Sequence, residues 1–227
     1  GDEVLISSFT CLAVPTAVIA AGAIPKYYDI DPDTMHADKE SLNNLISEKT
    51  KAVVTMHYGG YPCDMKKISK ITSENNLQLV EDSCEAHGSS IDGKKVGTFG
   101  DIATLSFYPA HHITMGEGGA VYTNNGKLKL IIESFRDWGR DCFCQPGHDN
   151  TCKKRFSYQL GELPCSYDHK YTYSHIGYNL KITDMQAAVA VAQMERLPEF
   201  IQTRRDNFSR LYDGLSDLQE YLILPEA

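Results

Sequence analysis

The chain has 227 residues, of which 42% are hydrophobic and 23% are charged, as is usual for a packed globular protein of one or two domains. The 22 Lys and Arg side chains against 30 Asp and Glu give a net charge of −8, which argues against nucleic acid as a partner. The longest apolar stretch, Cys11–Ile24, contains a proline and is shorter than the ~20 residues that cross a bilayer, so we expect no membrane-spanning segment.

In the first half of the chain, apolar runs of strand length alternate with segments of helical length. The expected strands are Glu3–Ser7, Pro25–Ile30, Ala52–Met56, Leu77–Glu81, Ile102–Phe107 and Ala120–Thr123. The expected helices are Pro15–Ala21, Asp38–Ser47, Asp64–Asn75 and Lys127–Arg136. Strands joined by crossovers of helical length are typical of an α/β protein with a mostly parallel sheet and helices on both faces.

The composition changes at about Asp137. From there to Tyr173 the chain is rich in Cys, Gly, Pro, Tyr and charged residues and has no clear periodicity, which is typical of a functional or mobile insert. Helical periodicity returns in Thr183–Arg196, and a second helix is expected over Glu199–Leu215.

Two polar residues lie at expected strand ends, where ligands gather in α/β sheets. Asp82 follows the strand Leu77–Glu81, and a carboxylate there can keep the ring nitrogen of a cofactor protonated. Ser106 lies near the end of Ile102–Phe107, where its hydroxyl can reach an anion. Taken alone, Asp82 is more simply interpreted as the cap of a loop, and the segment after Ser106 as a hairpin connection.

Seven cysteines make an odd number in a chain far larger than a disulfide-stapled miniprotein. They are Cys11, Cys63, Cys84, Cys142, Cys144, Cys152 and Cys165. This number indicates a reducing compartment, so we expect a cytoplasmic protein with some thiols in the core and others able to bind a metal.

Several long motifs, in the same order along the chain, resemble the DegT/DnrJ/EryC1/StrS sugar aminotransferase family. The motifs are GDEVLISSFTCLAVPTAVIAAGAIPKYYDID, HYGGYPCDM, VEDSCEAHG, GTFGDIATLSFYPAHHITMGEGGAVYTN, RDWGR and GYNLKITDMQAAVA. The resemblance implies the large domain of a fold-type-I pyridoxal-phosphate (PLP) transferase over residues 1–198, interrupted by the insert at about 137–173. It also implies that the fold is incomplete at both ends, with residues 199–227 forming a helix that leads to a small domain.

The resemblance also implies roles for three residues. Asp82 would pair with the pyridinium nitrogen of the cofactor, and Ser106 would contact its phosphate. Asn179 would reach the phosphate in a neighbouring subunit, so a homodimer is expected.

One position departs from the family pattern. The lysine that binds the cofactor covalently lies five residues after the serine, and here that position is His111. No lysine occurs between Val96 and Gly126. An imidazole cannot form an imine, but it exchanges protons near neutral pH because its ordinary pKa is about 6.5. We therefore expect His111 to be a catalytic base beside free pyridoxamine phosphate (PMP).

The cysteine spacing resembles that of the RfbH-like branch, the CDP-4-keto-6-deoxyglucose 3-dehydrases of 3,6-dideoxyhexose and O-antigen biosynthesis. Cys84 is followed after 57 residues by Cys142, then by Cys144 and Cys152. The resemblance implies that these four bind a [2Fe–2S] cluster, which a flavin and iron–sulfur reductase would supply with electrons. A zinc ion on Cys142, Cys144, Cys152 and His148 is the alternative that the residue types leave open.

The expected activity is therefore removal of the C3 hydroxyl from a nucleotide-linked 4-keto-6-deoxyhexose. A cluster-free dehydrase that uses the same histidine is a second hypothesis, and an ordinary sugar aminotransferase, opposed by the missing lysine, is a third. From another class of protein, a non-catalytic regulator with this fold or a zinc-stabilised binding module remains open. The retained Asp82, Ser106 and Asn179 argue against this last hypothesis.

Overall fold

The computed structural model describes residues 1–144 and 147–225 and divides the chain into two compact units. The sheet unit comprises Gly1–Tyr122 and Asp184–Ala227, and the cysteine unit comprises Thr123–Thr183. The expected boundary between residues 198 and 199 lies inside a single helix, α5 (Asp184–Leu215). The division into a large domain and a segment that leads to a small domain stays a prediction.

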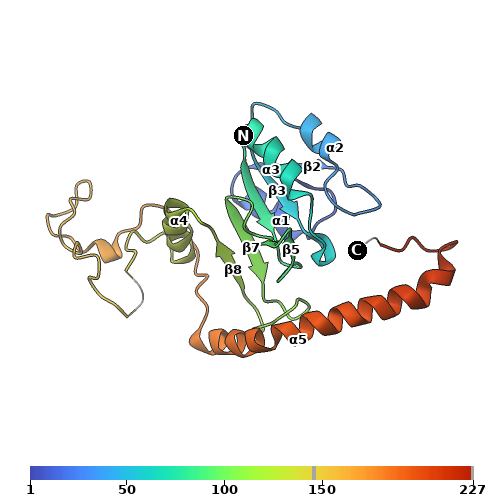
Figure 1. Cartoon of the computed structure of the whole chain (residues 1–227). Helices are drawn as coiled ribbons and strands as arrows, with labels where there is room; N and C mark the ends of the chain where they lie inside the picture. Colours follow the sequence, from blue (N-terminus) through green and yellow to red (C-terminus); the bar gives the residue numbers. More distant parts are fainter. Residues whose placement is uncertain (145–146, 226–227) are drawn as a thin grey trace. The chain divides into compact units, whose positions relative to one another are not determined.

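The sheet unit is built on six strands in the order β2-β1-β3-β4-β7-β8 (Figure 1). Every neighbouring pair is parallel except β7 and β8, which are antiparallel. The strands are β1 (Glu3–Ser7), β2 (Ile24–Tyr28), β3 (Thr50–Met56), β4 (Gln78–Asp82), β7 (Ile102–Ser106) and β8 (Gly119–Tyr122). All six expected strands are present, and the mostly parallel sheet is confirmed. The short pair β5 (Ser90–Ile91) and β6 (Lys94–Lys95) was not expected.

The main core lies on one face of this sheet. Leu5, Val53 and Leu79 are register partners on neighbouring strands, so their side chains share a face. Leu42 and Met65, both fully buried, pack onto this face from two crossover helices. The crossover helices are α1 (Ala13–Ala20), α2 (Lys39–Asn44) and α3 (Met65–Glu74). Because strand side chains alternate, residues one position along each strand face the opposite side, and this alternation organises the site.

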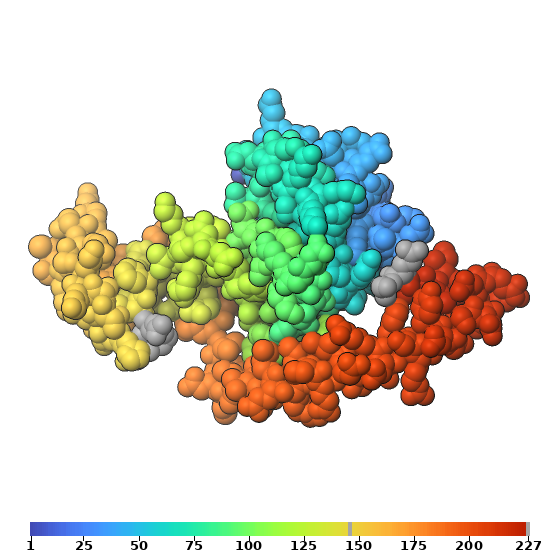
Figure 2. Space-filling model, in the orientation of Figure 1, coloured from blue at the N-terminus to red at the C-terminus, as the bar shows by residue number. Residues whose placement is uncertain are grey.

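The helix α5 differs from the sequence prediction. Two helices were expected on either side of residue 198, but one helix of 32 residues runs through Pro198. A proline inside a helix removes a hydrogen bond and usually breaks it. Here contacts with the sheet unit hold α5 on both sides of the proline: Gln193 accepts a hydrogen bond from the Thr114 amide, and Ile201 packs against Gly88. Most other α5 side chains are exposed (Figure 2). Within the described ranges, no helix is both long and apolar enough to cross a membrane.

The cysteine unit begins with a regular helix and continues with little secondary structure. The helix α4 (Gly126–Arg136) is capped by Asn125, which accepts hydrogen bonds from the first amides of the helix. After it, the only helical segment among the described residues of this unit is the single turn η2 (His169–Tyr171). The absence of periodicity in the sequence therefore corresponds to irregular backbone.

Local contacts order this irregular chain. Two segments cross closely at Gly139 and Gly177: a Cβ on Gly139 would lie 1.9 Å from the His175 carbonyl oxygen. Farther along, the Arg155 guanidinium donates two hydrogen bonds to the Asp168 carboxylate, at 2.9 and 2.8 Å. Such bidentate pairs fix geometry as well as adding energy.

Candidate active site

The carboxyl edge of the sheet brings Asp82 and Ser106 to the same face. Asp82 ends β4 and is the register partner of Thr104 on β7, so the two side chains point to the same side. The Thr104 hydroxyl lies 3.5 Å from Asp82 Oδ1 and donates to it. Ser106 lies two residues beyond Thr104 and therefore on the same face. This face is opposite to the one that carries Leu79 and the main core.

Cys84 also lies beside this carboxylate, beyond the end of β4 at Asp82. Its amide turns back and donates to Asp82 Oδ1, at 3.1 Å. The thiol then lies 3.7 Å from the Thr104 hydroxyl. Burial, together with the Asp82 carboxylate, raises the pKa of the Cys84 thiol to about 12.

His111 lies in the loop between β7 and β8, on a tight turn. The Ser106 hydroxyl accepts a hydrogen bond from the Tyr108 amide, and the His111 amide donates to the Tyr108 carbonyl. The Tyr108 and His111 rings meet edge to face with centroids 6.1 Å apart. The loop returns at Gly118, whose φ of +153° is unfavourable for other residues. Ser106, at the end of β7, and His111, in the loop that follows, are thus linked through hydrogen bonds to Tyr108.

His112 follows His111 and lies in a positively charged environment. Burial lowers the pKa of His112 to about 4, and the charges of Arg204, His87 and His111 act in the same direction. Its Nδ1 atom is buried without a hydrogen-bond partner. No feature of the sequence pairs Arg204 with this histidine, because α5 is far away along the chain.

The other three predicted metal ligands lie in the cysteine unit. Cys142, Cys144 and Cys152 are free thiols close enough to influence one another's ionisation. Burial raises the pKa of Cys142, whereas hydrogen bonds from Thr151 and then from the Cys152 backbone lower the pKa of Cys144 to about 6.

Cys152 is further held from two sides. It accepts a hydrogen bond from the Lys154 amide, and its sulfur lies 3.9 Å from Nε2 of the buried His169. In the part of the chain that the structure describes, no three His, Cys, Asp or Glu side chains lie close enough to hold a metal ion. Four unpaired thiols are the right donor type for an iron–sulfur cluster, and their role as its ligands stays a prediction.

Asn179 is an exposed residue of the cysteine unit. It pairs with Asp137 in an isolated antiparallel bridge, and Lys181 forms an ion pair with the same Asp137. The bridge fixes the backbone of Asn179 while leaving its side chain accessible. Its predicted contact with a neighbouring subunit stays a prediction.

The sequence matches the DegT/DnrJ/EryC1/StrS aminotransferase family over residues 1–227. Over the same 227 residues the chain is 54% identical to the lipopolysaccharide biosynthesis protein RfbH of Salmonella typhimurium. It is 48% identical over 227 residues to the dTDP-4-dehydro-2,6-dideoxy-D-glucose 3-dehydratase of Saccharopolyspora spinosa. All of this chain is aligned in both cases, against 52% and 49% of the two relatives, so it spans about half the length of the curated relatives that it matches.

Solved structures have the same fold. The E. coli GDP-4-keto-6-deoxy-D-mannose 3-dehydratase, solved with bound hydrated PLP, superposes with a TM-score of 0.81 at 28% identity, over 96% of this chain and 54% of that chain. An aminotransferase from Psychrobacter cryohalolentis has the same TM-score of 0.81 at 29% identity, over 97% of this chain and 52% of that chain. The expected fold class, that of fold-type-I PLP-dependent transferases, is confirmed. With its whole length matching the family and its fold shared with these enzymes, the chain belongs to the DegT/DnrJ/EryC1/StrS aminotransferase family.

Proposed function

We propose that this chain carries the catalytic residues of a 3-dehydrase that acts on a nucleotide-linked 4-keto-6-deoxyhexose, in deoxysugar and lipopolysaccharide biosynthesis. The observation that carries the proposal is His111, which stands five residues after Ser106 in a stretch without lysine. The similarity to RfbH and to two sugar 3-dehydratases supports it. The carrier that we propose is CDP, by the resemblance of the cysteine spacing.

The residues at the sheet edge fit PMP or PLP. When bound, PMP supplies an amine that condenses with the C4 ketone of the sugar and a ring that accepts electrons. Asp82, supported by Thr104 and the Cys84 amide, would hold the proton on the ring nitrogen. The Ser106 hydroxyl would donate to the cofactor phosphate, and Asn179 would do so across a homodimer interface.

His111 would move the proton in this reaction. A neutral His111 imidazole would remove a proton from the C4′ carbon of the cofactor, and the imidazolium would then protonate the C3 hydroxyl, which would leave as water. The edge-to-face contact with Tyr108 orients the ring for both transfers. Since the side chain cannot bind the cofactor covalently, the amino group stays on the cofactor and is not transferred.

Four thiolates, from Cys84, Cys142, Cys144 and Cys152, would hold a [2Fe–2S] cluster. The cluster would pass electrons one at a time from a flavin and iron–sulfur reductase. The four residues are free thiols, and Cys84 lies beside the cofactor-binding Asp82. We place the reaction in the cytoplasm, where these thiols stay reduced.

A cluster-free 3-dehydrase is a second candidate. It is favoured by the likeness to the GDP-4-keto-6-deoxy-D-mannose 3-dehydratase. Both candidates use His111 in the same way, but the cluster-free enzyme would complete the deoxygenation without external electrons.

Anaerobic purification of the full-length protein, followed by iron and zinc analysis and an absorbance spectrum, tests the proposal. About two irons per chain are expected for a [2Fe–2S] cluster. Stoichiometric zinc without iron would contradict the cluster, and absence of both metals in an active dehydrase would favour the second candidate. A borohydride-stable adduct between the cofactor and any side chain would contradict the free cofactor that both candidates require.

A further inference from the structure

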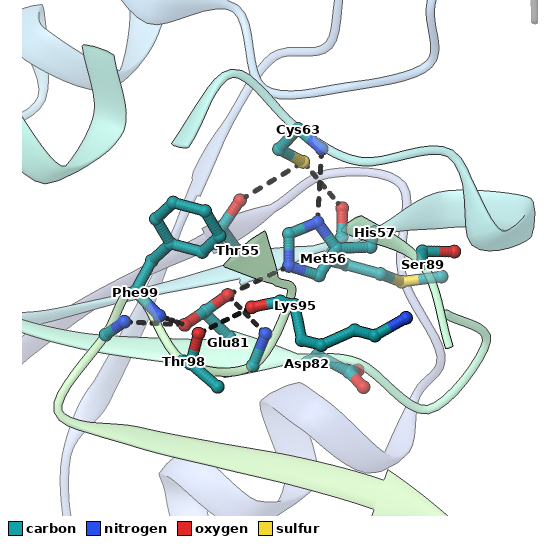
Figure 3. Close-up of polar contacts among 12 residues, drawn as sticks. Thr55, Met56, His57, Cys63, Glu81, Asp82, Ser89, Lys95, Thr98 and Phe99 are labelled. Carbon is teal, nitrogen blue, oxygen red and sulfur yellow. Dashed lines mark hydrogen bonds and ion pairs between the residues drawn. The ribbon is translucent and has the colours of Figure 1, made fainter. Parts of the chain in front are cut away.

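A carboxylate that the proposed reaction does not use is completely buried next to Asp82. Glu81 is 0% exposed and accepts four hydrogen bonds (Figure 3). Three come from the backbone amides of Gly97 (2.7 Å), Phe99 (2.6 Å) and Gly100 (2.5 Å). The fourth comes from His57 Nε2, at 3.2 Å. A buried carboxylate with this many donors is held in its charged form.

The influences on the pKa of Glu81 also favour its charged form. Burial by itself raises the pKa of a carboxyl group, but the hydrogen bonds from His57, Gly100 and Gly97 outweigh it and hold the pKa of Glu81 below its ordinary value. The imidazole is itself fixed, because the Cys63 amide donates to His57 Nδ1 at 3.1 Å and leaves Nε2 to donate to Glu81. No atom of either side chain is accessible to a ligand.

The network joins the two loops that flank the end of β4. One is the segment 57–63, which follows β3, and the other is the segment 96–101, which precedes β7. The approach of the second loop is so close that a Cβ on Gly100 would lie 2.6 Å from the Leu79 carbonyl oxygen. Only a backbone amide without a bulky neighbour can reach the carboxylate there.

The backbone of Asp82 is held by the same elements. The His57 amide donates to the Asp82 carbonyl oxygen at 3.1 Å, while the His57 ring donates to Glu81. Because side chains alternate along β4, Glu81 points into the core face and Asp82 points to the face that carries Ser106. Glu81 therefore holds the end of β4 from the core face, and Asp82 presents its carboxylate on the opposite face.

We infer that Glu81 is a positioning residue for the cofactor: the Glu81–His57 pair fixes the end of β4 so that the Asp82 carboxylate stays aligned with the ring nitrogen. The ring-nitrogen contact of Asp82 is part of the proposed function, on which this role rests. Glu81 acts through the backbone and touches no ligand.

The substitution Glu81→Gln tests this role. Glutamine keeps the size of the side chain, but its NH₂ group would face N–H donors and leave at least one of them unpaired. We expect the loop 96–101 to shift, the dissociation constant for PLP to rise at least about tenfold, and the absorbance spectrum of bound PLP to change. Absorbance or fluorescence titration of the full-length protein with PLP measures both.

Glu3→Gln is the matched control. Glu3 is also a buried carboxylate, only 7% exposed, and it accepts a hydrogen bond from Ser47 and pairs with Lys26. It lies at the start of β1, at the amino end of the strands and thus at the edge opposite to Asp82. Both substitutions should lower the melting temperature, but only Glu81→Gln should weaken PLP binding. If Glu81→Gln does not fold, His57→Asn, which removes the ring contact and keeps the carboxylate, replaces it.

Asp82→Asn separates the possible failures. The proposed function is wrong if the wild-type protein binds no PLP. It is also wrong if Asp82→Asn changes neither the affinity for PLP nor the absorbance spectrum of bound PLP. In both cases the role of Glu81 fails with it. If wild type and Asp82→Asn behave as proposed but Glu81→Gln binds PLP with the wild-type affinity and spectrum, only the role of Glu81 is wrong. Equal weakening of PLP binding by Glu3→Gln and Glu81→Gln would also contradict it, because general destabilisation would then explain the loss.

Discussion

The sheet unit and the cysteine unit position their functional side chains in different ways. At the sheet edge, Asp82 and Ser106 stand on strands whose register is fixed by backbone hydrogen bonds between residues far apart in sequence. In the cysteine unit, Cys152 is held by the neighbouring Lys154 amide and by His169, in a segment with almost no secondary structure. The carboxylate proposed to bind the cofactor thus stands on a hydrogen-bonded strand, whereas three of the four predicted metal ligands lie in irregular backbone.

Burial follows the same division. The strands of the sheet unit carry fully buried apolar residues such as Leu5 and Val53, whereas His169 is the only large side chain of the cysteine unit that is almost completely buried among the described residues. Ion pairs replace the apolar core there, above all the pair between Arg155 and Asp168. We therefore expect substitutions in the two units to differ in kind: loss of packing in one, and loss of local charge contacts or metal in the other.

The largest effect is expected for His111, the proposed catalytic histidine of the sheet unit. His111→Asn removes the group that exchanges the proton, so kcat should fall about 10²- to 10⁴-fold in a steady-state assay with the keto-sugar. PLP affinity and melting temperature should stay close to the wild-type values, since His111 is in a loop and not in the core. His111→Lys restores an amine and should give a borohydride-trapped adduct that wild type lacks. Full activity of His111→Asn would refute the proposed proton transfer.

In the cysteine unit, the corresponding test is metal content. Cys152→Ser should abolish the cluster and its visible absorbance, because serine is a poor ligand for iron in such clusters. Cys165→Ser is the matched control, since Cys165 is an exposed thiol in the same irregular segment and outside the predicted ligand set. Iron analysis after anaerobic purification compares the two variants. Equal iron in Cys152→Ser and Cys165→Ser would show that Cys152 is not a ligand.

The two units should also differ in how much a substitution lowers the free energy of unfolding. Leu42→Ala removes a fully buried side chain from the main core and should lower the free energy of unfolding by about 2–5 kcal/mol. Asp168→Asn keeps the capping oxygen but removes the charge that pairs with Arg155, and because solvent screens this pair its loss should cost much less than the loss of the Leu42 side chain. Urea denaturation of both variants, with hydrogen exchange in residues 147–183, measures the contrast. A cost of several kcal/mol for Asp168→Asn would contradict it.

The prediction with the smallest effect near neutral pH is a dependence of stability on pH that comes from His112. Its pKa is about 4 in the folded protein, against an ordinary value of about 6.5, so the unfolded chain binds this proton more readily. The free energy of unfolding should therefore fall as the pH drops from about 6.5 to about 4, by at most about 3 kcal/mol, and His112 should contribute no further change below that range.

His112→Gln tests this pH dependence. Removing the imidazole should flatten the stability curve between pH 6.5 and pH 4, as measured by urea denaturation at several pH values. The difference between the two curves isolates His112 from the other groups that titrate in this range. Parallel curves for wild type and His112→Gln would mean that burial and the Arg204 charge do not suppress its protonation.

Much of the site was readable from the sequence, for physical reasons. The strands are apolar runs of strand length, and the ends of these runs locate Asp82 and Ser106. That His111 stands where the family has its lysine follows from the resemblance to the family and from the five-residue distance to Ser106. Local pattern also gave the helix α3, where Asp64 caps the first turn and Met65 and Ile68 face the core.

What the tertiary structure decided depends on contacts between distant residues. The amino-acid sequence by itself determined the succession of the six strands along the chain. It also determined which polar residues stand at the strand ends, because both follow from local periodicity. It did not determine that Glu81 would meet His57 from 24 residues away, nor that α5 would continue through Pro198. Both outcomes depend on contacts within the sheet unit between residues far apart in sequence. A local sequence pattern does not show which distant group supplies the hydrogen bond or the contact.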